Sequence, residues 1–149
     1  MITADEVLKL DNQLCFPLYA ASRLVTQAYG PHLEKLGVTY LQYLVLMLLW
    51  ERDGQTVREL GTRLFLDSGT LTPVLKRLER TELIRRARRG TDERTVENRL
   101  TPAGRRLKRR AASVPIALVC QIGLELEEVG RIRTIVKGLV ERLQLAARA

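Results

Sequence analysis

The residues best suited to chemistry in this sequence are two cysteines, Cys15 and Cys120, which lie far apart in the chain. There is no CxxC pair, and the chain has a single histidine, His32. Because zinc sites need clustered ligands, the sequence predicts no metal site, and nothing in it indicates a cofactor. Two distant thiols in a cytosolic protein are usually buried and inert, and a redox-active pair is the more specific alternative.

A second feature with chemical potential is a strongly basic stretch from Lys76 to Arg110. It contains fourteen Lys and Arg against five Asp and Glu, so it carries +9, whereas the rest of the chain carries −1. Most of these cations are arginines, whose planar guanidinium groups match phosphate oxygens. We therefore expect this stretch to bind nucleic acid, the alternative being a solvated face of mixed charges.

Length and composition restrict the class of protein. With 149 residues, 46% of them hydrophobic, the chain is suited to one domain with a core, which argues against intrinsic disorder. The longest apolar run, residues 43–50, is too short to cross a bilayer, and the acidic opening does not resemble a secretory signal. We expect a soluble, cytoplasmic protein that does not act at a membrane.

The elements that must position Cys15 begin with a helix. Asp11 or Asn12 is expected to cap this helix, which should end near Gly30. Pro17 must lie in its first turn or kink it.

Three further helices are expected before the basic stretch. Pro31 suits the first position of a short helix that Gly37 stops. Thr39 to Gln42 form a capping box that opens a strongly apolar, deeply buried helix. Thr56 to Glu59 form a second capping box, followed by a short helix.

The next helix begins near Asp67 and suits a DNA groove. Its apolar residues recur at helical spacing and must face the core: Leu71, Val74, Leu75 and Leu78. The opposite side presents small polar residues followed by cations, namely Gly69, Thr72, Pro73, Lys76 and Arg80, with Ser68, Thr70 and Arg77 at the margins. Such residues approach base edges and phosphates. An ordinary amphipathic surface helix is the alternative, and a helix that begins at Pro73, capped by Thr72, stays open because proline lacks an amide donor.

After this helix the sequence period changes. Residues 84–89 and 95–100 predict two short strands joined by residues 90–94, a hairpin with a basic tip. Thr101-Pro102 is typical of a helix start; this helix could run to about Cys120, with a kink or early break at Pro115. After Gly123, apolar residues at helical spacing predict a last helix that needs a partner.

A helix, a recognition helix and a charged hairpin, in this order, predict a winged helix-turn-helix, so the fold class is mainly α with a small β-hairpin wing. We expect a single domain over 1–149. About 39–104 should form the winged helix-turn-helix, and about 8–37 and 105–147 the dimerisation helices. These terminal apolar helices would be half exposed in a monomer, which favours a homodimer.

This organisation resembles the MarR family of winged-helix transcription regulators over essentially the whole chain. Asp92-Glu93-Arg94, followed by Leu100-Thr101 and Gly104, is similar to that family's wing signature. The resemblance implies that Asp92 positions Arg94, whose guanidinium enters the minor groove, although a salt-bridged hairpin tip is the alternative. The predicted DNA-binding residues are Ser68, Thr70, Thr72, Lys76, Arg77, Arg86, Arg88, Asp92 and Arg94.

Within the family, the sequence is similar to the organic hydroperoxide resistance regulators. Residues 10–16 (LDNQLCF) resemble the sensing segment of that branch, and residues 66–73 (LDSGTLTP) resemble its recognition helix. Tyr29 and Tyr40 stand where the branch has two tyrosines of the partner subunit that hydrogen-bond the sensing sulfur. The resemblance thus implies that Cys15 senses and that both tyrosines support it; core packing is their alternative role.

Thiol chemistry is consistent with such a sensor. A thiolate attacks a peroxide and a thiol does not, so the site must lower the cysteine pKa below its free value of about 8.5. Hydrogen bonds donated by tyrosines and a helix N-terminus favour the thiolate. Attack gives a sulfenic acid at Cys15, which a second thiol captures as a disulfide. The resemblance implies that Cys120 of the partner subunit is this resolving cysteine; a buried apolar role for Cys120, or capping of Cys15 by a small thiol, is the alternative.

The sequence therefore predicts a homodimeric repressor that binds double-stranded operator DNA when reduced and releases it when organic hydroperoxide oxidises Cys15. A MarR-type repressor released by a small, non-oxidising ligand is the main alternative. A thiol peroxidase built on Cys15 lacks a nearby histidine or carboxylate and leaves the arginines unexplained, so we expect no enzyme. An architectural DNA-binding protein without sequence preference is a further alternative.

Overall fold

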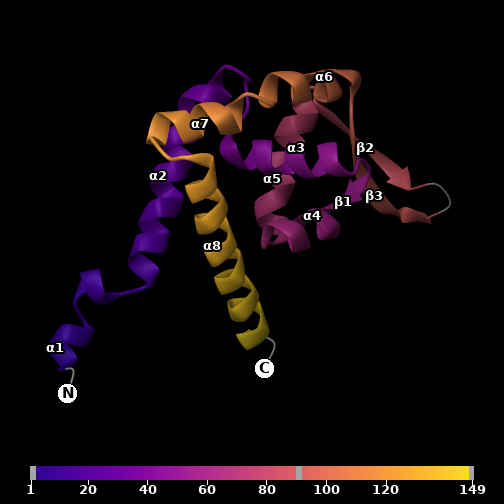
Figure 1. Ribbon diagram of the computed structural model, residues 1–149. Helices are drawn as coiled ribbons and strands as arrows, with labels where there is room; N and C mark the ends of the chain where they lie inside the picture. The colour runs from indigo at the N-terminus through magenta and orange to yellow at the C-terminus, as the bar shows by residue number, and fades with distance from the viewer. Residues whose placement is uncertain (1–2, 90–91, 148–149) are drawn as a thin grey trace. The chain divides into compact units, whose positions relative to one another are not determined.

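The structure, a computed structural model, describes the backbone of residues 3–89 and 92–147 and the side chains of residues 3–88 and 96–147 (Figure 1). It divides into two compact units, Met1–Ala112 and Ser113–Ala149, which are described separately below. The described residues are mainly helical with one three-stranded antiparallel sheet, which confirms the predicted fold class.

The N-terminal segment differs from the expectation at both ends of its main helix. After α1 (Ala4–Val7), a 3₁₀ turn at Leu10–Asn12 precedes α2 (Cys15–Glu34), so neither Asp11 nor Asn12 caps α2. The predicted break at Gly30 is also wrong, because α2 continues through Pro31. A residue before proline usually avoids the helical conformation because its Cβ and amide meet the proline ring, and glycine has no Cβ, so Gly30 can remain helical here.

Helix α3 (Tyr40–Glu51) forms the centre of the core. Thr39 and Gln42 make the expected capping box, with Thr39 N donating to Gln42 Oε1 at 2.8 Å. The helix is apolar on most of its surface and contacts α2, α4, α5 and α6. Its fully buried residues include Val45, Leu46 and Leu49, which confirms the predicted burial.

The helix-turn-helix consists of α4 (Val57–Leu64) and α5 (Ser68–Arg80), and the capping box that opens α4 is present as expected. The turn between the two helices is tight: Phe65 has a left-handed conformation (φ 56°), and a Cβ on Gly61 would lie 2.5 Å from the Leu66 carbonyl oxygen. Glycine at 61 is therefore required for α5 to pack against α4.

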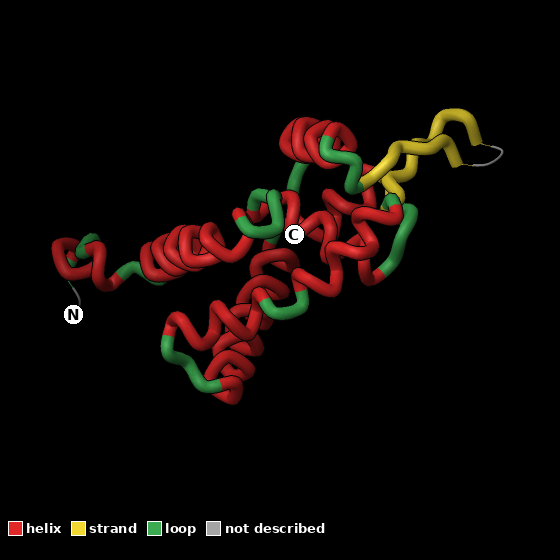
Figure 2. The backbone as a smooth tube through the Cα atoms, turned by 90° about the horizontal axis from the view of Figure 1, so that it is seen from above, coloured by secondary structure: helices red, strands yellow, loops and turns green. Residues whose placement is uncertain are grey.

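The wing is a β-hairpin of β2 (Ile84–Arg89) and β3 (Asp92–Leu100), which projects from the helices of its unit (Figure 2). The expected loop over 90–94 is too long, because the second strand begins at Asp92 and not at Thr95. A short strand that the sequence did not predict, β1 (Gln55–Thr56), pairs with β3 and gives the strand order β1-β3-β2.

The remaining helices follow the predicted starts. Thr101 caps α6 (Pro102–Ala111), which ends before Pro115, so the expected early break is confirmed. In the second unit, α7 (Val114–Ile122) has Pro115 in its first turn, and a left-handed Gly123 separates it from α8 (Leu126–Ala146). Among the described residues no helix combines the length and apolar character needed to cross a membrane.

Candidate DNA-reading surface and sensing cysteine

The start of α5 decides whether Pro73 lies inside the helix or begins it. Asp67 is the N-cap: its carboxylate accepts a hydrogen bond from Thr70 N at 2.8 Å and another from Thr70 Oγ1 at 2.9 Å. These two bonds, the backbone one first, lower the pKa of Asp67 below its ordinary value. The helix therefore begins at Ser68 and includes Pro73, so the alternative start at Pro73 is wrong.

The predicted hydroxyl contacts of α5 differ in how freely they can bind a ligand. Ser68 and Thr70 are exposed, and Thr72 is partly buried. Thr72 Oγ1 donates to the Ser68 carbonyl at 2.6 Å, and the Thr70 hydroxyl already donates to Asp67. Both threonine hydroxyls are thereby left to accept hydrogen bonds, which suits the exocyclic amino groups of adenine and cytosine better than phosphate oxygens.

The cations of α5 lie on its exposed side. Leu71, Leu75 and Leu78 are fully buried, as predicted, whereas Lys76 and Arg77 are exposed. Within the described part of the chain, neither cation has a side-chain hydrogen bond or ion pair. Unpaired cations next to small polar side chains can reach the flanking phosphates of a groove.

The wing contributes further cations. Arg86 and Arg88 are exposed and share one face of β2 with the buried Ile84, since alternate residues of a strand face the same side. The Arg86 amide donates to Glu79 Oε1 at 3.2 Å, which ties the strand to the last turns of α5. The side chains of Asp92 and Arg94 lie outside the described residues.

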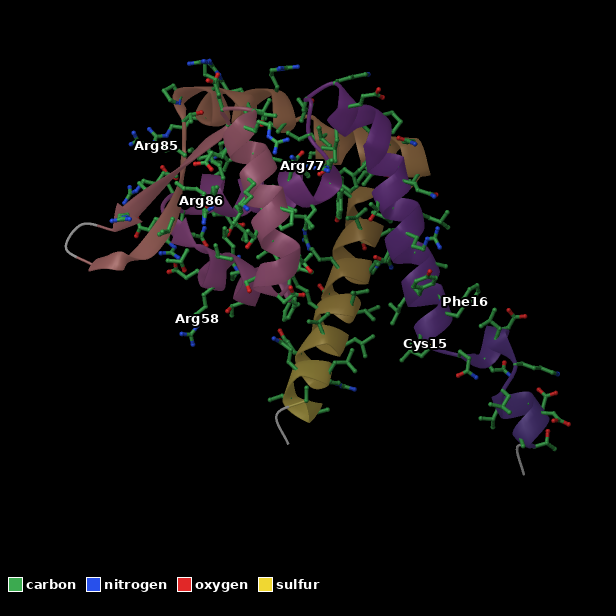
Figure 3. All side chains as sticks on the ribbon, turned by 180° about the vertical axis from the view of Figure 1, so that it is seen from behind. Cys15, Phe16, Arg58, Arg77, Arg85 and Arg86 are labelled. Atoms are coloured by element: carbon green, nitrogen blue, oxygen red, sulfur yellow. The ribbon has the colours of Figure 1, made fainter. Side chains whose placement is uncertain are left out.

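Sequence reasoning missed Arg58 on α4. Figure 3 shows its side chain pointing away from the helix, on the side of the unit where α4 joins the start of α5. It is exposed and has no ion-pair partner among the described residues, whereas Arg52 and Arg63 pair with Glu59 and Glu51. Its position inside the capping box, between Thr56 and Glu59, was the available signal. An exposed arginine there becomes a candidate DNA contact only once α4 is placed beside α5.

Cys15 is the first residue of α2 and its side chain is exposed, as is that of Cys120 on α7. Both thiols are therefore accessible in this protomer, and the alternative of two buried, inert thiols does not apply to it. The neighbours of Cys15 are apolar and also exposed: Leu14 is 66% exposed and Phe16 is 38% exposed. Figure 3 shows Cys15 and Phe16 at the N-terminal end of α2.

The two predicted supporting tyrosines lie together but not next to Cys15. The ring centroids of Tyr29 and Tyr40 are 5.1 Å apart, and Tyr43 lies 5.9 Å from Tyr29. Burial raises the pKa of Tyr29 and Tyr40, so both hydroxyls stay protonated donors at neutral pH. Tyr29 follows Cys15 by fourteen residues of continuous helix, or about 21 Å at 1.5 Å per residue, so the Tyr29 and Cys15 of one chain do not meet.

In the described ranges no group of three His, Cys, Asp or Glu side chains is arranged to hold a metal ion. The surface described above consists instead of polar and cationic side chains on a recognition helix and a β-hairpin. These features define a winged helix-turn-helix protein.

Comparison with known proteins agrees with this class. A family model described as transcriptional regulator SarA/Rot matches residues 27–110. The organic hydroperoxide resistance transcriptional regulator of Bacillus subtilis (strain 168) is 50% identical over 125 residues, which cover 82% of this chain and 85% of that protein. The chain belongs to the MarR family of winged-helix transcription regulators.

Two solved structures of AbfR from Staphylococcus epidermidis are also similar. Reduced AbfR bound to DNA is 36% identical with a TM-score of 0.79, over 95% of this chain and 99% of that one. The disulfide form of AbfR is 34% identical with a TM-score of 0.61, over 97% of each chain. The relatives are regulators of transcription, a role that is not enzymatic.

Proposed function

We propose that this chain is a homodimeric repressor that binds operator DNA when reduced and releases it when an organic hydroperoxide oxidises Cys15. Cys120 of the partner subunit then captures the oxidised sulfur as a disulfide. The observation that carries the proposal is the exposed Cys15 thiol at the start of α2, set among exposed apolar side chains in a chain half identical to an organic hydroperoxide resistance regulator.

Exposed apolar surface supports the homodimer. Large apolar side chains lie uncovered at the N-cap of α2, along α2 and along α8: Leu14, Phe16, Tyr19, Leu24, Val25, Leu126, Ile132, Ile135, Val136 and Leu143. Single exposed apolar residues are ordinary, but a series along two long helices is costly in water. A symmetric interface between two copies would cover both series.

A dimer also supplies the hydrogen-bond donors that one chain lacks around Cys15. Within a protomer the length of α2 separates Cys15 from Tyr29. If the start of α2 lies against the aromatic cluster of the partner, the two raised tyrosine pKa values keep hydroxyl donors beside the Cys15 sulfur. Donated hydrogen bonds stabilise the thiolate and so favour attack on peroxide.

The oxidation is balanced without any cofactor. The Cys15 thiolate attacks one oxygen of the O–O bond, an S–O bond forms, and the departing alkoxide takes a proton to become an alcohol. The thiol of Cys120 then attacks the sulfenic sulfur, so that an S–S bond forms and water leaves. The apolar neighbours Leu14 and Phe16 favour an organic peroxide over hydrogen peroxide.

Disulfide formation must act mechanically on DNA binding. The two sulfurs have to reach about 2 Å, and the flanking helices must move to allow it. Such a movement changes the spacing of the two recognition helices, which must enter successive major grooves. AbfR has been crystallised both reduced on DNA and as a disulfide, the two states that the proposal requires of this chain.

A decisive experiment compares wild type with Cys15→Ser and Cys120→Ser on the DNA upstream of the chain's own gene. We expect Cys15→Ser to bind this DNA as wild type does and to stay bound after one equivalent of cumene hydroperoxide. Cys120→Ser should still form a sulfenic acid at Cys15, seen by mass spectrometry, but no disulfide. Release of DNA by Cys15→Ser after peroxide would contradict the mechanism.

A second candidate function, release by a small non-oxidising ligand, has one observation in its favour. A hollow beside Tyr40 is lined by α2, the following turn and the start of α3: Thr26, Gly30, Leu33, Glu34, Gly37, Val38, Thr39, Tyr40 and Gln42. Release by an aromatic acid together with insensitivity to peroxide would favour this function over the redox mechanism.

A further inference from the structure

The outward side of α6 carries a second concentration of positive charge. Its cations, which we call the α6 cluster, are Arg105, Arg106, Lys108, Arg109 and Arg110. The helix contains no carboxylate, and its buried residues Gly104, Leu107 and Ala111 form one side. At 100° per residue, Arg106 and Arg109 lie nearly opposite this buried side.

Three cations of the α6 cluster have partners within the protein that account for their presence. Arg105 Nη2 lies 2.9 Å from Asp53 Oδ2, Lys108 donates to the Trp50 carbonyl at 3.3 Å, and Arg110 donates to the Lys35 carbonyl at 2.6 Å. These contacts hold α6 against α3 and the end of α2.

Arg106 and Arg109 have no such explanation. Both are exposed, and among the described residues neither side chain has a hydrogen bond or ion pair. Glu79 and Glu82 line a hollow beside Arg106 but do not pair with it. Like charges three residues apart destabilise a helix, and the helix dipole favours cations only in the last turn, which excludes Arg106. A binding partner would account for two unpaired guanidinium groups.

The cluster is separate from the DNA-reading surface. In Figure 1, α6 and α4 lie on opposite sides of α3, and the start of α5 is on the α4 side. A duplex read by Ser68 and Thr70 therefore lies across the unit from Arg106 and Arg109. The basic stretch that looks continuous in the sequence thus supplies two surfaces.

We propose that the α6 cluster binds the phosphate backbone of a second DNA duplex, so that one regulator dimer bridges two DNA segments. Four of its five cations are arginines, whose forked guanidinium groups match phosphate oxygens. The outward residues of α6 include no large apolar or aromatic side chain, and protein interfaces usually depend on such residues. A nucleic acid therefore fits better than an acidic protein. The proposed DNA-reading surface holds the first duplex, and the inference rests on the proposed function only for that step.

The test immobilises a biotinylated duplex of the chain's own upstream DNA, loads reduced full-length protein, and measures capture of a fluorescein-labelled duplex of unrelated sequence. We expect wild type to capture the labelled duplex. The double variant Arg106→Gln/Arg109→Gln should bind the immobilised duplex within about twofold of wild type but capture about tenfold less, with a salt slope of capture lower by about two. Arg131→Gln/Arg133→Gln, which loses the same charge from exposed positions of α8, should capture as wild type does.

Three outcomes would overturn the proposal. Wild type could retain the first duplex without capturing the second, the α6 variant could capture as well as wild type, or a polyglutamate peptide could bind the cluster in place of DNA. If wild type fails to bind the immobilised duplex, the proposed DNA-reading function is contradicted instead. Direct titration with the unrelated duplex at low salt then tests the cluster alone, and equal affinity of wild type and the α6 variant would refute it.

Discussion

The side-chain amide of Asn98 donates a hydrogen bond to the backbone carbonyl of Gln55 at 2.9 Å, in the interior of the protein. Gln55 in turn donates its own amide to the carbonyls of Leu48 and Arg52, each at 2.7 Å. This buried relay joins β3 to β1 and to the end of α3. The attachment of the wing to β1 and to the end of α3 therefore depends on polar contacts as well as on apolar packing.

Asn98→Ala should destabilise the protein, because it leaves the buried Gln55 carbonyl without its donor. We expect a loss of about 1–3 kcal/mol in the free energy of unfolding, measured by urea denaturation. Asn12→Ala is a matched control: Asn12 also donates its amide to a backbone carbonyl, that of Glu6 at 2.7 Å, but at an exposed position where water replaces the bond. Equal losses for both variants would contradict the role of burial.

Gly61→Ala should disturb the turn between α4 and α5. The added Cβ would lie 2.5 Å from the Leu66 carbonyl oxygen, and that oxygen belongs to the backbone, so the turn itself must shift. We expect a loss of about 1–3 kcal/mol in stability, together with weaker DNA binding. Thr62→Ala, at the next and exposed position of α4, should change the unfolding free energy by less than about 0.5 kcal/mol.

Tyr29→Phe and Tyr40→Phe should slow the reaction of Cys15 with iodoacetamide. A hydroxyl that donates to the Cys15 sulfur stabilises the reactive thiolate, so losing it should lower the alkylation rate about tenfold at neutral pH. Because burial raises the pKa of both tyrosines, the difference should persist up to the pH at which they ionise. Tyr43→Phe, from the same aromatic cluster, is the control and should leave the rate unchanged.

Glu59 should make part of the stability depend on acid pH. Its pKa is lowered from 4.5 to about 2, first by the hydrogen bond from the Thr56 amide and then by those from Arg52 and the Thr56 hydroxyl. A lowered carboxyl pKa stabilises the fold above pH 4.5, and this contribution is lost as the pH falls toward 2. The side chain is 38% exposed, so solvent screens part of the effect. Urea midpoints between pH 5 and pH 2.5 should fall less steeply for Glu59→Gln than for wild type.

Arg58→Gln should weaken DNA binding and reduce the salt slope by about one, as expected for loss of a single phosphate contact. Arg63→Gln is the matched control on the same helix, because Arg63 is engaged by Glu51 at 3.1 Å. Fluorescence anisotropy titrations at several salt concentrations measure both quantities. An unchanged slope for Arg58→Gln would place Arg58 outside the DNA contact.

The elements that were predicted correctly depend on local hydrogen bonds. Thr39, Thr56 and Thr101 each accept a bond from the amide three residues later, so the sequence alone marks where those helices begin. The failures involve competing or distant effects. Helix α2 continues through Gly30 and Pro31, although both residues favour a helix end, and β1 exists because Gln55 pairs with Asn98, 43 residues away.

The residues of the candidate site likewise divide into those that the local sequence predicts and those that depend on distant contacts. Ser68, Thr70 and Lys76 could be proposed from the sequence because all three lie outside the apolar stripe of a single helix, whereas Arg58 required the packing of α4 beside α5. The proposed roles of Cys15 and Cys120 would involve a second subunit, and no periodicity within one chain describes such a contact. Resemblance to relatives supplied those roles, which the cysteine variants now test.

The indole of Trp50 donates to the Gly104 carbonyl at 2.9 Å, and its ring lies 6.3 Å from that of Tyr43. Since the chain has a single tryptophan, its emission comes from one place, between the tyrosine cluster and the helix that carries the α6 cluster. The protein therefore contains its own optical probe between the tyrosine cluster and α6. Stopped-flow fluorescence can follow peroxide addition without a label and time the structural response against the chemistry at sulfur.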